Sequence, residues 1–556
     1  MNKTISLTGT MPEFRGLFPG CGAVGKKTII RSIQSLYLDD CLLILSKLSR
    51  HYYKYVNNRV VNGDNIYRKL CFELLDERVI KLIERSENDG EKYNIIFPEL
   101  SILYLVKLCL KYCDKSGHTL TIDFEPETLH SIGKSLLIAN SIMDDQQSRI
   151  LAVADTQSEA FLINFTKQLI ADTHIEFNQK MYCNYFLFNL LFNKYNNEFD
   201  ISSVFLRKYG VKIEEYFAFL FLLFSQFLIK DGEDADKEMP FFNLHIALQN
   251  TKIKFNDDII ENFLINKINY NKIDDDFFNF FSIIENPLVK IHDNIVIPIN
   301  FKYFILSITD GLYFDIYNFL EEDDQKKYST FFGKAIEDYF QEIIINISKT
   351  AILSFEYKVK KETKETPDAV IVENGAIVMF ECKKRQFHTS EFLKNGNKQM
   401  YIDRVHEFFY KPLDQIGKRI KDFRNNLYTI DGATTDFIIY PVVICPVAPP
   451  IFSGAWDSYN LSEYVIPENL KNDIMIAEPE FIDFEELECI EAYLNANPDK
   501  TITDLIKIKR GDEQFHNANW MVILQKNGMA LINKRLRTKY QNEISKFKNL
   551  LFRKNI

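Results

Sequence analysis

The stretch TPDAVIVENGAIVMFECKK, Thr366 to Lys384, decides what the centre of this chain can be. Two apolar runs rich in β-branched residues, 369–372 and 376–380, flank the dipeptide Asn374-Gly375. That dipeptide best satisfies the positive φ angles of a two-residue type I′ turn, so the stretch predicts a tight β-hairpin. Both faces of this hairpin are apolar, which is typical of a central strand pair buried on both sides.

The turn also fixes the register of the hairpin. Counting outward from it places Asp368 directly opposite Glu381. Cross-strand partners have Cβ atoms about 5 Å apart, so two like charges in these positions repel unless a cation lies between them. Lys383 lies two residues beyond Glu381, and the alternation of a strand places its side chain on the same face, whereas Cys382 points the other way.

Two carboxylates and an ammonium group at the end of a buried strand pair are suited to metal-assisted hydrolysis of a phosphodiester. Carboxylate oxygens are the ligands that Mg²⁺ prefers, and the metal acidifies a water molecule and neutralises the phosphate. Lys383 would orient this water or stabilise the charge that develops during the reaction.

The motif formed by Pro367-Asp368, twelve intervening residues and Glu381-Cys382-Lys383 resembles the signature of the PD-(D/E)XK nuclease superfamily, which has the restriction-endonuclease-like fold. The resemblance implies that Asp368 and Glu381 bind Mg²⁺, with Mn²⁺ able to substitute. It further implies Glu337 as an additional direct or water-bridged ligand, and it allows the Cys382 carbonyl as another ligand. Lys383 is then the residue that orients the water and stabilises charge.

Segments on both sides of the hairpin match the order of elements in that superfamily. Phe331 to Ile347 reads as a helix whose apolar stripe is bordered by Glu337, and Gly333 would let this helix approach the sheet closely. Ile352 to Lys360 supplies a first strand, a second helix with Pro412 in its first turn follows the hairpin, and Phe437 to Val447 supplies the next strand.

The second helix carries a further candidate site residue. Gln415 matches a glutamine that many members of the superfamily place near the site, where it would contact the attacking water or DNA. Four residues later, where the fuller motif has a tyrosine, this chain has Arg419. This difference departs from the exonuclease-like branch of the superfamily.

We expect a multidomain fold that combines α+β and α/β architecture. Apolar positions spaced three and four apart predict a mainly helical region over residues 1–325. The resemblance implies, by fold-level analogy, that this region regulates the protein or binds a partner or target. Residues 326–450 would form the nuclease core, a mixed sheet flanked by helices. Residues 451–556 would form a small α/β extension, with a hairpin at Asn527-Gly528 and a basic amphipathic helix from Asn533.

The charge is distributed unevenly along the chain. The net charge of −10 argues against a general nucleic-acid binder. Residues 357–425, however, contain 15 basic and 10 acidic residues and carry +5, so the remainder carries −15. Residues 533–556 contain 8 basic residues and one acid and carry +7. Basic charge is therefore concentrated where a polyanion would dock, although basic residues can also merely solvate a helix face.

The cysteines and the apolar segments indicate the cellular compartment of the protein. The nine cysteines are scattered, and no CxxC pair or His-x-His run suggests zinc, so we expect reduced, buried thiols in a cytoplasmic protein. The start of the chain lacks the apolar segment of a signal peptide. The longest apolar run, Tyr216 to Ile229, has fourteen residues where a membrane span needs about twenty, which predicts a buried core helix.

A glycine-rich stretch, GCGAVGKKT from Gly20 to Thr28, resembles a phosphate-binding P-loop. A true P-loop has serine or threonine directly after its lysine and follows a buried strand, whereas here Lys27 stands in that position. The alternative is a glycine-rich loop that enters a helix. A nucleotide-driven switch at this stretch predicts nucleotide affinity that is lost on Lys26→Ala.

These features lead to one preferred function and one alternative from another class. The preferred function is a Mg²⁺-dependent nuclease, with DNA as the expected substrate and a protein partner or a second copy as further partners. By fold-level analogy, such a nuclease with a large helical appendage resembles effectors of restriction or antiphage defence. The alternative is a non-catalytic scaffold that retains the fold as a docking surface and has no reason to bind Mg²⁺ or Mn²⁺ at the hairpin.

Overall fold

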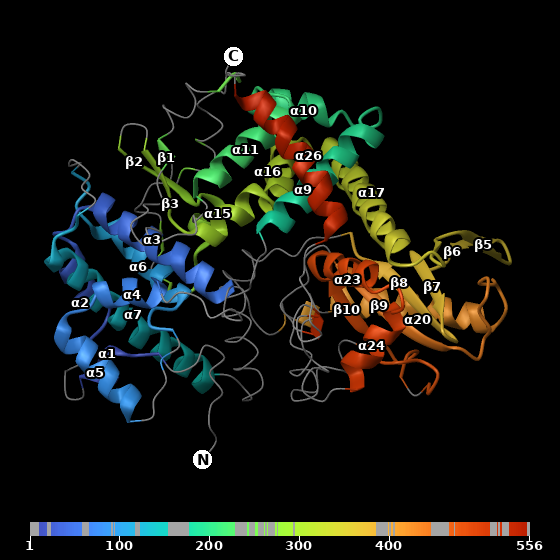
Figure 1. The fold of residues 1–556 in the computed structure, drawn as a ribbon, viewed down its shortest axis with the longest axis horizontal. Coiled ribbons are helices and arrows are strands. Elements are labelled where there is room, and N and C mark those ends of the chain that lie inside the picture. The colour runs from blue at the N-terminus through green and yellow to red at the C-terminus, as the bar shows by residue number, and fades with distance from the viewer. Residues whose placement is uncertain are drawn as a thin grey trace.

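The structure of the chain is a computed structural model, drawn in Figure 1. It describes residues 11–18, 24–57, 66–89, 93, 95–116, 123–153, 177–227, 242–243, 251–253, 261, 264, 273–274, 276–292, 295–384, 399, 402–403, 406–445, 466–471, 473–511, 520, 523–524 and 533–552. Helices make up most of the described residues before residue 320, and a mixed sheet lies in the part that follows. The expected combination of a helical region with an α/β part is therefore observed.

Two groups of helices form the first part of the chain. The first group contains α1 (Phe14–Leu17), α2 (Lys26–Ile33), α3 (Leu38–Asn57), α4 (Ile66–Glu73), α5 (Glu77–Asn88), α6 (Glu99–Tyr112) and α7 (Pro126–Val153). The second contains α9 (Phe177–Tyr195), α10 (Ile201–Tyr209), α11 (Ile213–Phe227), α14 (Phe281–Glu285), α15 (Phe301–Ile308) and α16 (Asp310–Phe319). A small sheet with the order β1-β3-β2 lies between the groups in Figure 1.

The small sheet consists of β1 (Phe242–Asn243), β2 (Leu288–His292) and β3 (Ile295–Pro298). Strands β2 and β3 pair antiparallel, and α15 follows β3. The apolar run at Tyr216 lies in α11, whose side chains are largely buried, which confirms the predicted core helix. Among the residues described, no helix is long and apolar enough to cross a membrane.

A five-stranded sheet with the order β10-β9-β8-β7-β4 is the centre of the second part. Its strands are β4 (Ile352–Leu353), β7 (Ala369–Glu373), β8 (Ala376–Cys382), β9 (Ile438–Cys445) and β10 (Glu480–Asp483). Strand β7 pairs antiparallel with β8 in the predicted register, with Glu373 opposite Ala376 and Ala369 opposite Phe380. Strands β8, β9 and β10 run parallel. Asn374 and Gly375 have φ angles of 50° and 72°, which confirms the type I′ turn.

Each face of this sheet is covered by one of the two expected helices. Helix α17 (Glu322–Ile347) covers the face that carries Phe380, and the ring of Phe340 lies 6.1 Å from that of Phe380. Helix α20 (Lys411–Arg424) covers the opposite face, which carries Val370 and Met379. Pro412 lies in the first turn of α20, as predicted. The strand pair is therefore buried on both sides.

Two expected elements differ in extent from the structure. The helix predicted from Phe331 begins earlier, at Glu322. Its first turn contains Glu322, Asp323 and Asp324, whose negative charges interact favourably with the helix dipole and stabilise this earlier start. The strand predicted over Ile352 to Lys360 is divided into β4 and β5 (Glu356–Val359).

The division of that strand has a local cause. The backbone N–H of Phe355 donates to the Oγ1 of Thr366, and the chain then leaves the main sheet to pair with β6 (Glu362–Glu365). The β5–β6 segment is rich in charged residues, which suits an exposed two-stranded ribbon better than a buried strand.

The remaining described elements are the π-helical turn η3 (His406–Tyr410) before α20 and the C-terminal helices α23 (Phe484–Ala496), α24 (Ile502–Gly511) and α26 (Lys534–Leu551). The side chain of Asn533 caps α26, which confirms a helix beginning at this point. The hairpin predicted at Asn527-Gly528 lies outside the described residues.

The buried core crosses the expected junctions at 325 and 450. Near the beginning of α17, Tyr328 packs against Phe199, and Phe332 packs against Phe188 of α9. Residues of α9 to α11, α17, the main sheet and the C-terminal helices belong to one cluster of buried side chains. Helices α2 to α7 form a second cluster with residues 273–303. The division at 325 and 450 remains a prediction about folding units.

Candidate active site at the end of strands β7 and β8

The two predicted metal ligands lie where β7 begins and β8 ends. Asp368 directly precedes β7 and Glu381 is the last residue but one of β8, one step beyond the final ladder pair. Alternation along the strands places both carboxylates on the face covered by α20, in line with Val370 and Met379. Both side chains are half-buried, so the pair lies at the rim of the core and not on an open surface.

The environment of these carboxylates favours their protonated forms. Burial is the main cause that raises the pKa of Glu381 to about 8, and the negative charge of Asp368 adds to it. Burial likewise raises the pKa of Asp368 to about 6, although the backbone N–H of Cys382 donates a 2.7 Å hydrogen bond to its Oδ2. At neutral pH the pair therefore holds a proton that a cation could replace.

Lys383 lies close to Glu381, as the alternation predicts. Its positive charge lowers the pKa of Glu381 against the effect of burial. The backbone N–H of Lys383 donates to the carbonyl of Ile444 over 2.7 Å, which extends the pairing with β9 one residue beyond the end of β8. This extra hydrogen bond fixes the backbone from which the ammonium group projects.

Glu337 reaches the same strand end from the opposite face of the sheet. It lies on α17, and its Oε2 accepts a hydrogen bond from the Nζ of Lys384 over 2.5 Å. Lys384 passes beside Gly333, where an added Cβ would lie 3.4 Å from the lysine Cδ. The sequence predicted that Gly333 would let the helix approach the sheet closely, whereas in the structure the atoms nearest to a Cβ added at this glycine are those of the Lys384 side chain. The charge of Glu337 also raises the pKa of Asp368, so the two carboxylates interact across the strand end.

Arg419 is a site residue that the sequence did not assign. After burial and the charge of Asp368, its positive charge has the next largest effect on Glu381, where it lowers the pKa. Arg419 Nη1 lies 3.5 Å from the hydroxyl of Tyr357. The signal was present in the sequence, because Arg419 stands where the fuller superfamily motif has a tyrosine one helical turn after Gln415.

The β5–β6 ribbon supports the helix that carries Arg419. The hydroxyl of Tyr357 on β5 donates to Asp422 of α20 over 2.6 Å, and Lys364 on β6 donates to the same carboxylate over 2.9 Å. The hydroxyl of Tyr428 donates to the backbone carbonyl of Arg419 over 3.0 Å. These contacts hold α20 in place beside the strand end.

Two further predicted residues have different surroundings. Gln415 is exposed on α20, and within the described part of the chain it forms no hydrogen bond, so its contact with water or DNA stays a prediction. The side chain of Cys382 is buried on the α17 face, and burial raises the pKa of its thiol. Its backbone N–H donates a hydrogen bond to Asp368. Its backbone carbonyl stays a predicted ligand of the metal ion.

Glu337, Asp368 and Glu381 do not all converge on one point as the ligands of a single metal ion would. Over the ranges that the structure describes, groups of three or more metal-ligating side chains with ligand atoms within 4.8 Å of one another are limited to one set of cysteines. Glu337, Asp368 and Glu381 therefore do not converge to that distance. Asp368 acts electrostatically on Glu381, and Glu337 forms an ion pair with Lys384.

The basic helix α26 lies against other helices. Arg535 forms ion pairs with Glu342 of α17 and with Glu491 of α23, and Lys539 also pairs with Glu342. Part of the positive charge counted in this tail is thus neutralised inside the protein. A role of α26 in docking a polyanion stays a prediction that would rest on its remaining basic residues.

The glycine-rich stretch at Gly20 to Thr28 is described only from Val24 onward. Gly25 precedes α2, whose first turn contains Lys26 and Lys27. The ammonium group of Lys26 lies over the ring of Tyr112, 5.8 Å from its centre. A helix beginning after a glycine is common to a P-loop and to a glycine-rich loop that enters a helix, so both interpretations stay predictions.

Comparison with known proteins gives no guide to this site. No family model, no curated protein and no solved structure matches the chain.

Proposed function

We propose that this protein is a metal-dependent nuclease that hydrolyses phosphodiester bonds, with DNA as the expected substrate. The observation that carries the proposal is the half-buried pair Asp368 and Glu381, whose pKa values are raised to about 6 and about 8 beside Lys383 and Arg419. Two acids placed together in this way, with cationic side chains around them, are typical of sites that bind a divalent metal and a phosphate.

The residues present fit a hard divalent cation. Asp368 and Glu381 would hold it through carboxylate oxygens, the Cys382 carbonyl could add a ligand, and Glu337 would act through a bridging water because Lys384 already occupies its carboxylate. When bound, Mg²⁺ or Mn²⁺ would supply an acidified water and neutralise charge on the phosphate. A dication between the carboxylates would also offset the negative charge of Asp368, which adds to burial in raising the pKa of Glu381.

The other side chains have separate roles in this proposal. Lys383 would orient the attacking water or stabilise the charge that develops on the phosphate. Arg419, fixed by the contacts of α20 with the β5–β6 ribbon, would bind a phosphate oxygen, for which a guanidinium group is well suited. Gln415, one turn before Arg419, is open to solvent and available for a nucleic acid.

A restriction-endonuclease-like core is part of the same proposal. The order of α17, β4, the β7–β8 hairpin, α20 and β9 supports it, because this is the order that the superfamily resemblance implies. The candidate site lies at the end of the central hairpin, between the helices that cover the two faces of the sheet. A role as an effector of restriction or antiphage defence, with the helical region sensing a trigger, rests on fold-level analogy alone.

Cleavage by the purified full chain tests the proposal directly. Plasmid, linear duplex, single-stranded DNA and RNA would each be incubated with Mg²⁺, Mn²⁺ or EDTA. We expect cleavage of DNA with either metal and none with EDTA. Cleavage that persists unchanged in Asp368→Asn or Lys383→Ala would contradict the assigned site. Plasmid nicking separates internal cleavage from digestion of ends.

Calorimetry separates the nuclease from a non-catalytic scaffold without the need for a substrate. Titration with Mn²⁺ at pH 7, in buffers with different ionisation enthalpies, measures the protons released on binding. Because Glu381 has a pKa of about 8, we expect one bound metal to release about one proton. Glu381→Gln should abolish both the binding and the release, whereas Glu362→Gln on the exposed ribbon serves as the control. Absence of Mn²⁺ binding by the wild-type protein would favour the scaffold.

A further inference from the structure

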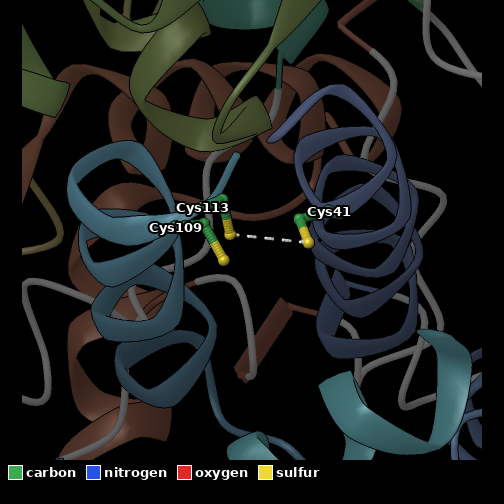
Figure 2. Close-up of side chains that lie close together, drawn as sticks. All are labelled: Cys41, Cys109 and Cys113. Carbon is green, nitrogen blue, oxygen red and sulfur yellow. Dashed lines mark hydrogen bonds between the residues drawn. The ribbon is translucent and has the colours of Figure 1, made fainter. Parts of the chain in front are cut away.

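Three cysteines from distant parts of the sequence meet in the core of the first helical group. Cys41 lies on α3, Cys109 lies on α6, and Cys113 directly follows α6 one turn later (Figure 2). Cys41 and Cys109 are fully buried and Cys113 is 6% exposed. Figure 2 shows their side chains directed into the space between the two helices.

The distances between the sulfur atoms suit a bound metal better than a disulfide. The Sγ atoms of Cys41 and Cys113 lie 3.8 Å apart, and all three Sγ atoms lie within 4.8 Å of one another. A disulfide needs a separation of about 2.05 Å. In contrast, ligands at a metal–sulfur distance of about 2.3 Å stand about 3.8 to 4.0 Å from one another in tetrahedral or trigonal geometry.

A backbone clamp holds the two helices in the positions that bring these sulfur atoms together. The N–H of Leu38, at the start of α3, donates to the carbonyl of Asp114 over 2.7 Å. The N–H of Asp114 in turn donates to the carbonyl of Leu36 over 2.9 Å, and Tyr37 and Asp114 form a short parallel bridge. Because Asp114 is next to Cys113, the clamp fixes Cys113 against the first turns of α3.

We propose that Cys41, Cys109 and Cys113 bind one soft, thiophilic metal ion in a three-coordinate site, a chemistry for which Cu(I) is the appropriate probe. Thiolate ligands select soft ions, and Cu(I) is stable with three sulfur ligands. A structural zinc site would need a fourth ligand, and within the described residues no further histidine, cysteine or carboxylate joins the set.

Binding exchanges protons for the metal without any redox step. Each thiol that becomes a ligand forms a bond from sulfur to the metal and gives its proton to solvent. The oxidation state of the ion does not change, provided that the metal is supplied as Cu(I) under anaerobic conditions. The ion replaces the hydrogen bond between Cys41 and Cys113, and the core around the site stays apolar.

The test uses the full chain titrated with Cu(I) in the absence of oxygen, in competition with a chromogenic Cu(I) chelator. We expect one Cu(I) per chain, an ultraviolet thiolate-to-metal charge-transfer band and a higher unfolding temperature. Cys41→Ala, Cys109→Ala and Cys113→Ala should each weaken retention against the chelator by at least tenfold. Cys71→Ala is the matched control, because Cys71 is fully buried in the same core but outside the cluster.

A second measurement keeps the proposal open to refutation if a variant fails to fold. The wild-type protein with and without Cu(I) would be unfolded briefly in the presence of an alkylating reagent, and the modified cysteines located by mass spectrometry. Protection of Cys41, Cys109 and Cys113 together, with Cys71 modified, supports the site. Loss of all Cu(I) to the chelator, equal protection of Cys71, or preferential binding of Zn²⁺ with a tetrahedral spectrum after Co²⁺ substitution would overturn it.

Discussion

The strand end at Asp368 and the cysteine cluster at Cys41 are both sites where ionisable side chains gather, yet they are built in opposite ways. The first unites carboxylates, lysines and an arginine at the half-buried rim of a sheet. The second unites three sulfur atoms in an apolar core closed to solvent. Oxygen ligands at an open edge suit a hard ion and a charged substrate, whereas buried sulfur suits a soft ion that stays bound.

The two sites also differ in how far apart their residues are in the sequence. A single turn between Asp368 and Glu381 sets their register, so local geometry alone brings them together. Cys41 and Cys109 are brought together by the packing of α3 on α6. A site formed within one hairpin can be inferred from its spacing, and a site formed by helix packing requires the tertiary structure.

The largest expected effect tests whether the carboxylate site and the cysteine site act independently. Asp368→Asn should reduce DNA cleavage about a thousandfold or more, which corresponds to on the order of 4 kcal/mol in the barrier, because a neutral amide binds Mg²⁺ poorly. The same variant should bind Cu(I) as the wild type does, and Cys41→Ala should cleave DNA at the wild-type rate. Cleavage rates and Cu(I) competition measured on both variants check this independence. Loss of both properties in either variant would show that the sites are coupled.

A substitution of Arg419 tests its role beside the carboxylates Asp368 and Glu381. Arg419→Ala should lower the cleavage rate about tenfold to a hundredfold, since a charged hydrogen bond to phosphate contributes about 1.5 to 3 kcal/mol. Lys421→Ala removes an exposed cation two positions away on α20 and should change the rate less than threefold. Equal losses in the two variants would mean that overall charge on the helix matters rather than the position of Arg419.

The stability of the protein against pH tests the buried carboxylates without a substrate. The pKa of Glu381 is raised from 4.5 to about 8 in the folded state. The stability associated with its protonated form is therefore fully present below about pH 4.5 and is lost as the pH rises through about 8. Glu381→Gln resembles the protonated acid, so at pH 9 we expect it to be more stable than the wild type.

The size of this gain is on the order of 1 to 2 kcal/mol once solvent screening is allowed for. Urea unfolding of both proteins at pH 5 and pH 9 measures it, with Mg²⁺ absent. The advantage of Glu381→Gln should be much smaller at pH 5, where the side chain is protonated in the folded wild type and the pH is only slightly above the pKa of 4.5 that the side chain has in the unfolded chain. An advantage of the same size at both values would assign the gain to packing instead of charge.

The smallest expected effect concerns the ion pair on the α17 side. Lys384 is 43% exposed and Glu337 is 26% exposed in their side chains, so this salt bridge should contribute less than about 1 kcal/mol to stability. Lys384→Ala should therefore leave the unfolding midpoint nearly unchanged. If Glu337 assists the metal through water, the variant should bind Mn²⁺ severalfold more tightly because the carboxylate is released. Weaker Mn²⁺ binding would show that Lys384 supports the site directly.

Much of the fold near the hairpin was predictable because it follows from short-range rules. The Asn374-Gly375 turn fixed the strand register, and the apolar stripes of the helices at Phe331 and Leu413 identified what covers the sheet. The division of the expected strand at Phe355 was not predictable, because it depends on a hydrogen bond to Thr366 eleven residues later. Propensity alone does not indicate such a tertiary contact.

The candidate site was predictable in part for the same reason. Alternation placed Asp368, Glu381 and Lys383 together, and their mutual effects on pKa agree with that placement. The role of Lys384 as the partner of Glu337 was missed, because the lysine reaches around the strand end past Gly333. The position of Arg419 beside Glu381 depends on how α20 crosses the sheet, which the sequence does not specify.

Helix α17 is one long continuous helix that joins two parts of the molecule. Its 26 residues form one uninterrupted rod of about 39 Å. Near its beginning, Tyr328 packs against Phe199 and Phe332 packs against Phe188 of α9, and Glu337 lies farther along. In Figure 1 it extends from the upper helices to the sheet. Because this helix is continuous, the same rod that packs among aromatic side chains at Tyr328 also sets the position of the Glu337 carboxylate beside the strand end.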